Sequence, residues 1–114
     1  MKITIIGSTA YKDKMVAYAA ELKQFGHEVS IPAFDCHPEY DEMGIVTHNK
    51  DLISQADRID VLWDCRSPGT LFDLGMAFAL NKPIKVVYLN DKTLENLVKK
   101  LQKLHTKTMQ EENS

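Results

Sequence analysis

The chain has 114 residues, which suits one domain with a core large enough to fold without disulfides or bound metal. Hydrophobic residues make up 44% and charged residues 26%, the composition of an ordinary globular protein. The formal net charge of -2 gives no long-range attraction to nucleic acid polymers or anionic membranes, so any anion site must be local.

Cysteine usage and apolar runs bear on the compartment. The two cysteines are too few for a disulfide framework and lack the spacing of metal ligands, so we expect no metal and no cofactor. No apolar run approaches the roughly 20 residues that span a bilayer, and charged residues come too early for a signal peptide. We therefore predict a cytoplasmic protein without a membrane partner.

The first half of the chain predicts two strands around one helix. Residues 2–6 are an apolar, β-branched run followed by Gly7, which is typical of a buried parallel strand. Residues 12–25 repeat apolar side chains at helical spacing, and Gly26 follows as a stop signal. Residues 28–31 predict a short strand, and residues 33–44, which show no period, predict a surface loop.

The second half predicts two more strands and three helices. Residues 45–56 place Asn49 on the apolar side of a helix and Asp51 on its other side. Residues 59–63 and 84–89 predict strands, and residues 64–80 predict a strand end, a tight loop and a buried helix. Thr93 opens a last helix with an apolar stripe, and residues 107–114 are a polar tail that we expect to fray.

Strict alternation of strands and helices predicts a three-layer α/β fold of the Rossmann or flavodoxin-like type. We expect a single domain over residues 1–106, with four parallel strands in the order 2-1-3-4 and helices on both faces; a fifth strand is absent or irregular. Such sheets bind ligands at the carboxyl ends of their strands. The loop at Gly7, Ser8 and Thr9 should therefore meet the loop that runs from Asp64 to Thr70.

The entry to the helix after the third strand is a candidate anion site. Arg66, Ser67, Gly69 and Thr70 supply a guanidinium, hydroxyls and amides at a helix N-terminus, which suits a phosphate or a carboxylate. An ordinary helix-entry loop that holds only water explains the same residues. Gly7 lacks the neighbouring glycines of a dinucleotide or phosphate loop, so it either admits a small ligand or permits a positive φ.

Asp73 is the single acid in an otherwise apolar helix. An ionised carboxylate among leucine, phenylalanine and methionine side chains is costly to bury unless something pairs with it or uses it. Thr70 and Asp73 also have the spacing of a capping box, in which Asp73 would only cap its own helix. Both explanations are open from spacing alone.

Two further carboxylates could converge on the same site, Asp51 from the preceding helix and Asp64 from the end of the third strand. Paired carboxylates serve glycosidic bond cleavage, one as the nucleophile and the other holding or protonating the substrate. On an exposed helical face, Asp51 could equally be a solvated side chain.

Several segments together resemble the nucleoside 2-deoxyribosyltransferase-like superfamily. They are Gly7-Ser8 after the first strand, DLISQAD at residues 51–57, SPGTLFDLGMA at residues 67–77, and Lys82-Pro83. The match covers residues 1–89, and its most specific part is the G-T-x-x-[E/D]-L-G-x-A segment.

The resemblance implies that Asp73 is a nucleophile, since the family has a glutamate there that attacks the anomeric carbon of a 2′-deoxynucleoside. It implies a supporting role for Asp51. Ser67, six residues before Asp73, resembles the 2′-deoxynucleoside 5′-monophosphate N-hydrolases, which hold a phosphate there. Aspartate is shorter than glutamate by about 1.5 Å, and a misplacement of about 1 Å can cost on the order of 100-fold in rate. Either the backbone compensates or the chain binds a nucleotide without cleaving it.

We therefore expect an enzyme that cleaves or transfers the N-glycosidic bond of a 2′-deoxynucleoside or its 5′-monophosphate. The alternative is a non-catalytic nucleotide-binding or sensing module. The helix around Asp73 is apolar nearly all round, so it packs either against a second copy, in a homo-oligomer with a dimer favoured, or against the sheet alone. The catalytic candidates are Asp73 and Asp51, and the substrate-binding candidates are Gly7, Ser8, Thr9, Asp64, Arg66, Ser67, Gly69 and Thr70.

Overall fold

A computed structural model of the protein describes residues 1–32, 39–91, 95 and 98–104. In chain order the elements are β1 (Lys2–Gly7), the single 3-10 turn η1 (Thr9–Tyr11), α1 (Lys12–Gln24), β2 (Glu28–Ser30), α2 (Glu42–Gln55), β3 (Arg58–Trp63), α3 (Pro68–Ala79) and β4 (Ile84–Leu89). Residues 98–104 form a further helical segment. None of the helices in these described ranges has the length and apolar run that crossing a bilayer requires.

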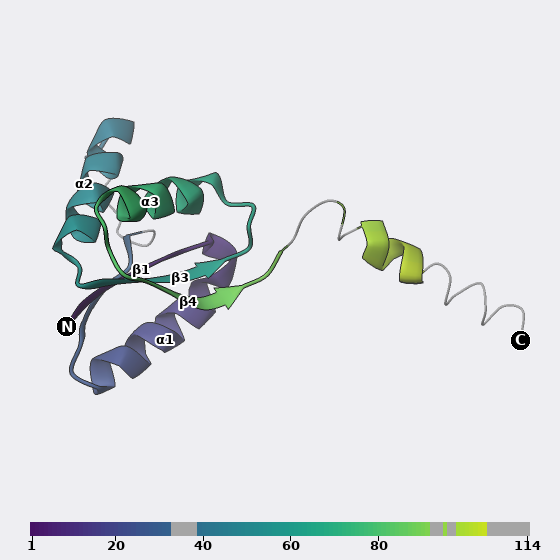
Figure 1. Cartoon of the computed structure of the whole chain (residues 1–114), viewed down its shortest axis with the longest axis horizontal. Helices are drawn as coiled ribbons and strands as arrows, with labels where there is room; N and C mark the ends of the chain where they lie inside the picture. The colour runs from purple at the N-terminus through teal and green to yellow at the C-terminus, as the bar shows by residue number, and fades with distance from the viewer. Residues whose placement is uncertain (33–38, 92–94, 96–97, 105–114) are drawn as a thin grey trace, which may run out of the picture.

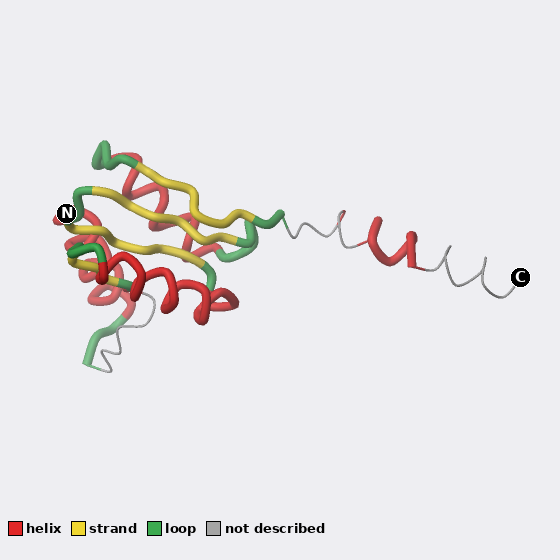
Figure 2. The backbone as a smooth tube through the Cα atoms, turned by 90° about the horizontal axis from the view of Figure 1, so that it is seen from below, coloured by secondary structure: helices red, strands yellow, loops and turns green. Residues whose placement is uncertain are grey.

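The strands form one parallel sheet in the order β2-β1-β3-β4. Helix α1 covers one face of this sheet, and α2 and α3 cover the other (Figure 1). Figure 2 shows the strands lying side by side between these helices. The predicted three-layer fold and strand order are confirmed, and the described residues add no fifth strand.

Alternation along the strands divides the core between the two faces of the sheet. The α1-side cluster consists of Ile3, Ile5, Tyr11, Met15, Ala19, Leu22 and Leu62. The α3-side cluster consists of Ile6, Ile53, Ala56, Ile59, Val61 and Ala77. Because β1 and β3 contribute to both clusters, they form the centre of the domain.

The element boundaries differ from the prediction mainly at α2. This helix starts at Glu42, three residues before the predicted start, because the side chain of Asp41 caps it: the Gly44 amide donates to Asp41 Oδ1 at 2.8 Å. Gly26 has the positive φ of 87° expected of the residue that stops α1. Residues 33–38 of the predicted loop, Thr93 and the predicted tail lie outside the described residues.

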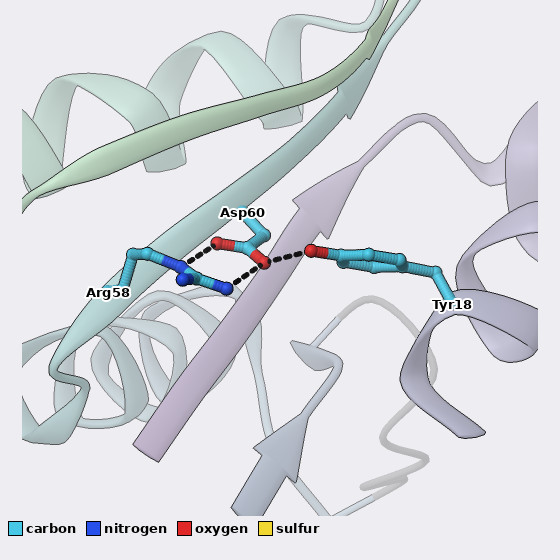
Figure 3. Close-up of polar contacts among 3 residues, drawn as sticks. All are labelled: Tyr18, Arg58 and Asp60. Atoms are coloured by element: carbon cyan, nitrogen blue, oxygen red, sulfur yellow. Dashed lines mark hydrogen bonds and ion pairs between the residues drawn. The ribbon is translucent and has the colours of Figure 1, made fainter. Parts of the chain in front are cut away.

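One buried polar cluster joins β3 to α1 (Figure 3). The fully buried carboxylate of Asp60 accepts hydrogen bonds from Arg58 Nε at 2.6 Å and Arg58 Nη2 at 2.9 Å, and from the Tyr18 hydroxyl at 2.6 Å. Burial, followed by the hydrogen bond to Asp60, raises the pKa of Tyr18 to about 12. Every oxygen of the carboxylate thus has a donor, and the cluster lies on the face of the sheet opposite α3.

Candidate functional site

The loops after β1 and β3 meet at the carboxyl edge of the sheet, as the strand order predicted. The Ser8 hydroxyl donates to Asp64 Oδ1 at 2.8 Å, and the Asp64 amide donates to Ser8 Oγ at 3.2 Å. Ser8 is buried, whereas Thr9 is exposed at the start of η1. This pair of hydrogen bonds fixes the two loops to each other.

Gly7 is explained by the close approach of β1 to β3. A Cβ atom at this position would lie 2.2 Å from the backbone oxygen of Leu62. Among the described residues, a positive φ occurs only at Gly26, Cys65 and Asn81, so the proposal that Gly7 permits a positive φ is wrong. The glycine instead lets the Ser8 amide donate to the Leu62 oxygen at 3.0 Å.

Asp64 organises the loop that enters α3. Its Oδ1 accepts the backbone amides of Arg66 at 3.0 Å and Ser67 at 3.1 Å, in addition to the Ser8 hydroxyl. Burial raises the pKa of Asp64, but these hydrogen bonds outweigh it and hold the pKa below its usual value. The turn includes Cys65 at φ 61°, a left-handed conformation that a cysteine adopts only under local constraint.

The N-terminus of α3 keeps part of the predicted anion site. Ser67 is the N-cap and Pro68 follows it, so the amides left for an anion within the described structure are those of Gly69 and Thr70. The buried Thr70 donates from Oγ1 to Ser67 Oγ at 3.1 Å. Arg66 is exposed and makes no ion pair with any described residue.

Asp73 lies on the side of α3 that packs against α2. Because Ser67 is the N-cap, Asp73 is the sixth residue of the helix, and the capping-box interpretation is wrong. The half-buried carboxyl is held by a hydrogen bond from Asn49 of α2. Burial raises the pKa of Asp73 to about 6, and the Asn49 hydrogen bond opposes part of that shift.

The residue that α2 presents to Asp73 is Asn49. Asp51 comes two residues later, which rotates it about 200° around the helix, and its side chain is exposed. No hydrogen bond or ion pair between Asp51 and Asp73 is found in the described part of the chain. The sequence carried a signal for Asn49, since it is a polar residue on the apolar stripe of the helix, but the site prediction passed over it.

The arrangement is suited to carboxylate chemistry. A carboxyl with a pKa of about 6 is mostly ionised at neutral pH, yet it is only partly hydrated, which favours a nucleophile or a general base. Within residues 1–32, 39–91, 95 and 98–104, no group of three or more His, Cys, Asp or Glu side chains converges as a metal site would.

Lys82 has a structural contact next to the site. Its Nζ donates to the backbone oxygens of Ser54 at 2.7 Å and Ala56 at 2.9 Å, which satisfies the C-terminal end of α2. This contact ties the turn after α3 to the C-terminal end of α2, the helix that carries Asn49, so α2 and α3 are also joined at this end.

Comparison with known proteins finds a similarity to a solved structure. No protein-family model matches the chain, and no curated protein does. Among solved structures, the chain is similar to the Clostridium botulinum CMP N-glycosidase BcmB, with a TM-score of 0.60 and 24% sequence identity. The similarity covers 91% of this chain and 80% of that one. It supports the α/β fold described above.

Proposed function

We propose that the chain cleaves the N-glycosidic bond of a nucleoside 5′-monophosphate, with Asp73 as the nucleophile. The observation that carries the proposal is a half-buried carboxyl, held by Asn49, on the helix whose N-terminus offers donors for an anion. The similar fold of a CMP N-glycosidase supports the same type of bond. The resemblance to the nucleoside 2-deoxyribosyltransferase-like superfamily supports a 2′-deoxyribose sugar and leaves hydrolysis and transfer as alternatives.

The reaction is a double displacement at the anomeric carbon. An Asp73 oxygen attacks C1′ as the C1′–N bond breaks, and the base leaves with the bonding electrons and takes up a proton. Water, or a second base in a transferase, then attacks C1′ and releases the carboxylate. Only the ionised carboxyl can attack, so activity should rise with pH through about 6.

Helix α3 supplies both ends of the proposed substrate site. Asp73 is six residues beyond Ser67, about 9 Å along the helix axis at 1.5 Å per residue. A phosphate at the helix N-terminus would meet the Gly69 and Thr70 amides, the Ser67 hydroxyl and the Arg66 guanidinium. The sugar would then extend along the helix towards Asp73. Three more residues, Gly7, Ser8 and Asp64, hold the loop in place, and the exposed Thr9 lies at its mouth.

Asn49 takes the supporting role that the resemblance implied for Asp51. Its hydrogen bond fixes the orientation of the Asp73 carboxyl and favours the ionised form. Replacing Asn49→Ala should therefore lower kcat and move the acidic limb of the pH–rate profile above pH 6. The matched change Asp51→Ala should leave both unchanged, because that side chain is exposed and turned away.

The direct test is chromatography of CMP, dCMP and the other common nucleoside and deoxynucleoside monophosphates after incubation with the protein. We expect release of free base by the wild type and a loss of about a thousandfold or more in Asp73→Ala. Failure to release any base at high enzyme concentration would remove the proposal, and so would full activity in Asp73→Ala.

The same panel separates the enzyme from a nucleotide-binding module. Nucleotides that raise the melting temperature without losing their base would favour the binding module. An Asp73→Glu variant that gains activity would show that the shorter acid limits the wild type. If the wild type and Asp73→Glu are both inactive, the short aspartate side chain does not explain the lack of cleavage.

We also propose that a second copy of the chain packs on the outward side of α3. Phe72 and Ala79 share this side and are exposed, although phenylalanine is a costly residue to leave in water. Sedimentation should give a dimer for the wild type and a shift towards monomer for Phe72→Gln. A wild type that sediments as a monomer at all concentrations would contradict the dimer.

A further inference from the structure

An uncovered apolar groove lies between α3 and the edge strand β4. Its volume is about 510 Å³. The lining residues are Val61, Trp63, Leu71, Leu74, Gly75, Phe78, Ile84, Val86 and Leu89. Several of these side chains are strongly exposed, including Phe78 at 77% and Val86 at 59%. A surface of this kind is expected to be covered by another element or partner.

The groove leaves one face of β4 open. Val87 and Tyr88 turn towards the α1-side cluster and are half-buried, whereas Ile84, Val86 and Leu89 turn towards the groove and are exposed. Strands of parallel sheets are normally covered on both faces, because their connecting helices pack there. The domain therefore lacks one covering element at this edge.

The helical segment at residues 98–104 has the complementary surface. Val98, Leu101 and Leu104 lie along one side of it and are all more than half exposed. Lys99 and Lys103 occupy the opposite side, where Lys99 pairs with Glu95 at 3.0 Å. In Figures 1 and 2 this segment stands clear of the domain, so its apolar side is in water.

We propose that the helix at residues 98–104 docks into the groove of its own chain. The five residues 90–94, between β4 and the helical Glu95, can span up to about 16 Å at roughly 3.3 Å each, which exceeds the roughly 10 Å between packed layers. The helix can therefore cross over from the end of β4 and lie antiparallel to it along the groove. Right-handed crossovers are the rule, and one that continues outward from β4 returns on the face that α3 covers.

Connectivity favours this occupant over a second copy. A segment tethered by the five residues 90–94 has an effective concentration near its groove in the millimolar range, which exceeds the concentration of free chains in solution. Docking would bury Val98, Leu101 and Leu104 against Phe78, Val86 and Leu89, and it would leave the lysines in water. It would also cover the outer flank of the helix that carries Asp73.

Trp63 is the only tryptophan in the chain and it lines the groove, so it reports on docking directly. We expect the double change Leu101→Gln and Leu104→Gln to shift Trp63 emission to longer wavelength and to raise its acrylamide quenching constant roughly twofold, because the indole regains water. Val86→Gln should do the same from the groove side. The control Lys99→Gln with Lys103→Gln, on the opposite side of the helix, should change neither.

Protein concentration separates the two occupants. Docking within one chain predicts that the difference between wild type and the leucine variants is unchanged on dilution. A difference that disappears on dilution would assign the groove to a second copy and overturn the proposal. Identical quenching in wild type and variants would overturn it as well.

A disulfide test supports the docking independently, because it does not use the glutamine variants, whose folding could be disturbed. In a chain whose native cysteines are replaced by serine, Val86→Cys with Leu101→Cys should form an intramolecular disulfide on mild oxidation, since the bond needs Cβ atoms about 3.8 Å apart. The pair Val86→Cys with Lys103→Cys places the second thiol on the far side of the helix, about 160° around from Leu101, and should remain reduced. Equal oxidation of the two pairs, or of neither, would contradict docking.

Discussion

At the scale of single residues, Asp60 and Asp73 differ in how many hydrogen-bond donors their carboxylates have. Asp60 is 0% exposed, and its carboxylate accepts three hydrogen bonds from Arg58 and Tyr18. Asp73 is half-buried, and the structure describes one donor to it, Asn49. A fully partnered carboxylate can stay buried at little net cost, whereas a poorly partnered one is available to react.

Removing one member of the Asp60 cluster should lower the free energy of unfolding more than replacing its charged pair with apolar residues. Arg58→Met leaves a buried carboxylate without its counter-ion, so we expect a loss of about 3–5 kcal/mol in the free energy of unfolding. Tyr18→Phe removes one hydrogen bond and should cost about 1 kcal/mol. The double change Arg58→Met with Asp60→Leu should cost less than Arg58→Met alone. Urea unfolding measures all three, and equal losses for Arg58→Met and Tyr18→Phe would contradict this account.

Asp73 should make stability depend on pH. Its pKa of about 6 in the folded chain lies above the ordinary 3.8, so ionisation is harder in the folded state than in the unfolded state. The penalty is absent below about pH 4, grows as the pH rises towards 6, and is constant above that. Asp73→Asn should therefore raise the melting temperature at pH 7.5 and have little effect at pH 4, with a gain of at most about 3 kcal/mol.

The control for this prediction is Asp51→Asn, which removes an exposed carboxylate from the neighbouring helix. It should not alter the pH dependence of the melting temperature. A gain from Asp73→Asn that is the same at pH 4 and pH 7.5 would show that the buried charge is not its cause.

At the scale of the elements, two glycines in the site region should respond in opposite ways to the same change. Gly7→Ala would put a methyl group 2.2 Å from the Leu62 backbone oxygen, so β1 and β3 would have to separate. We expect a loss of about 1–3 kcal/mol or more. Gly75 of α3 has open space around its Cβ position, and Gly75→Ala should gain about 0.5–1 kcal/mol from helix propensity. Thermal unfolding of the two variants tests the contrast, which equal effects would contradict.

The helices and strands were largely predictable, because the spacing of apolar residues and the stop signals of glycine and proline act locally in the sequence. Strand β4 was predicted at its observed bounds, and Gly26 ends α1 as its position indicated. The start of α3 was not, since Ser67 and Thr70 are both good N-cap residues. Pro68, a residue favoured in the first turn, was the signal that decides between them.

The details of the site depended on contacts between distant segments, which a sequence pattern does not encode. Asp64 accepts hydrogen bonds from two loop amides and from Ser8, which comes from the loop after another strand, β1. The partner of Asp73 was predicted from the acids in the chain, but helix geometry presents Asn49. The roles of Asp73 and the phosphate-binding residues stay predictions until substrates are tested, and so does the choice of Asn49 over Asp51 as the supporting residue.

At the scale of the whole molecule, the sheet couples the two halves of the core. Strand β1 directs Ile5 into the α1-side cluster and Ile6 into the α3-side cluster, and β3 does the same with Leu62 and Val61. If either cluster came apart, apolar side chains of β1 and β3 would be exposed to water, which would destabilise both strands. The described fold should therefore unfold as one unit, as most small domains do.

This coupling can be tested with a change on one face and a probe on the other. Met15→Ala empties a fully buried position in the α1-side cluster and should cost about 2–5 kcal/mol. If the faces unfold together, the urea midpoint of Trp63 fluorescence, which reports on the α3 face, should fall as far as that of far-UV circular dichroism. The control is Phe25→Ala at the end of α1, the helix that carries Met15. Phe25 is 76% exposed, so this change should move neither midpoint.

A Trp63 midpoint that stays in place in Met15→Ala would mean that α2 and α3 remain packed on the sheet after α1 has unfolded. Asp73 would then keep its surroundings when the other face of the sheet has unfolded.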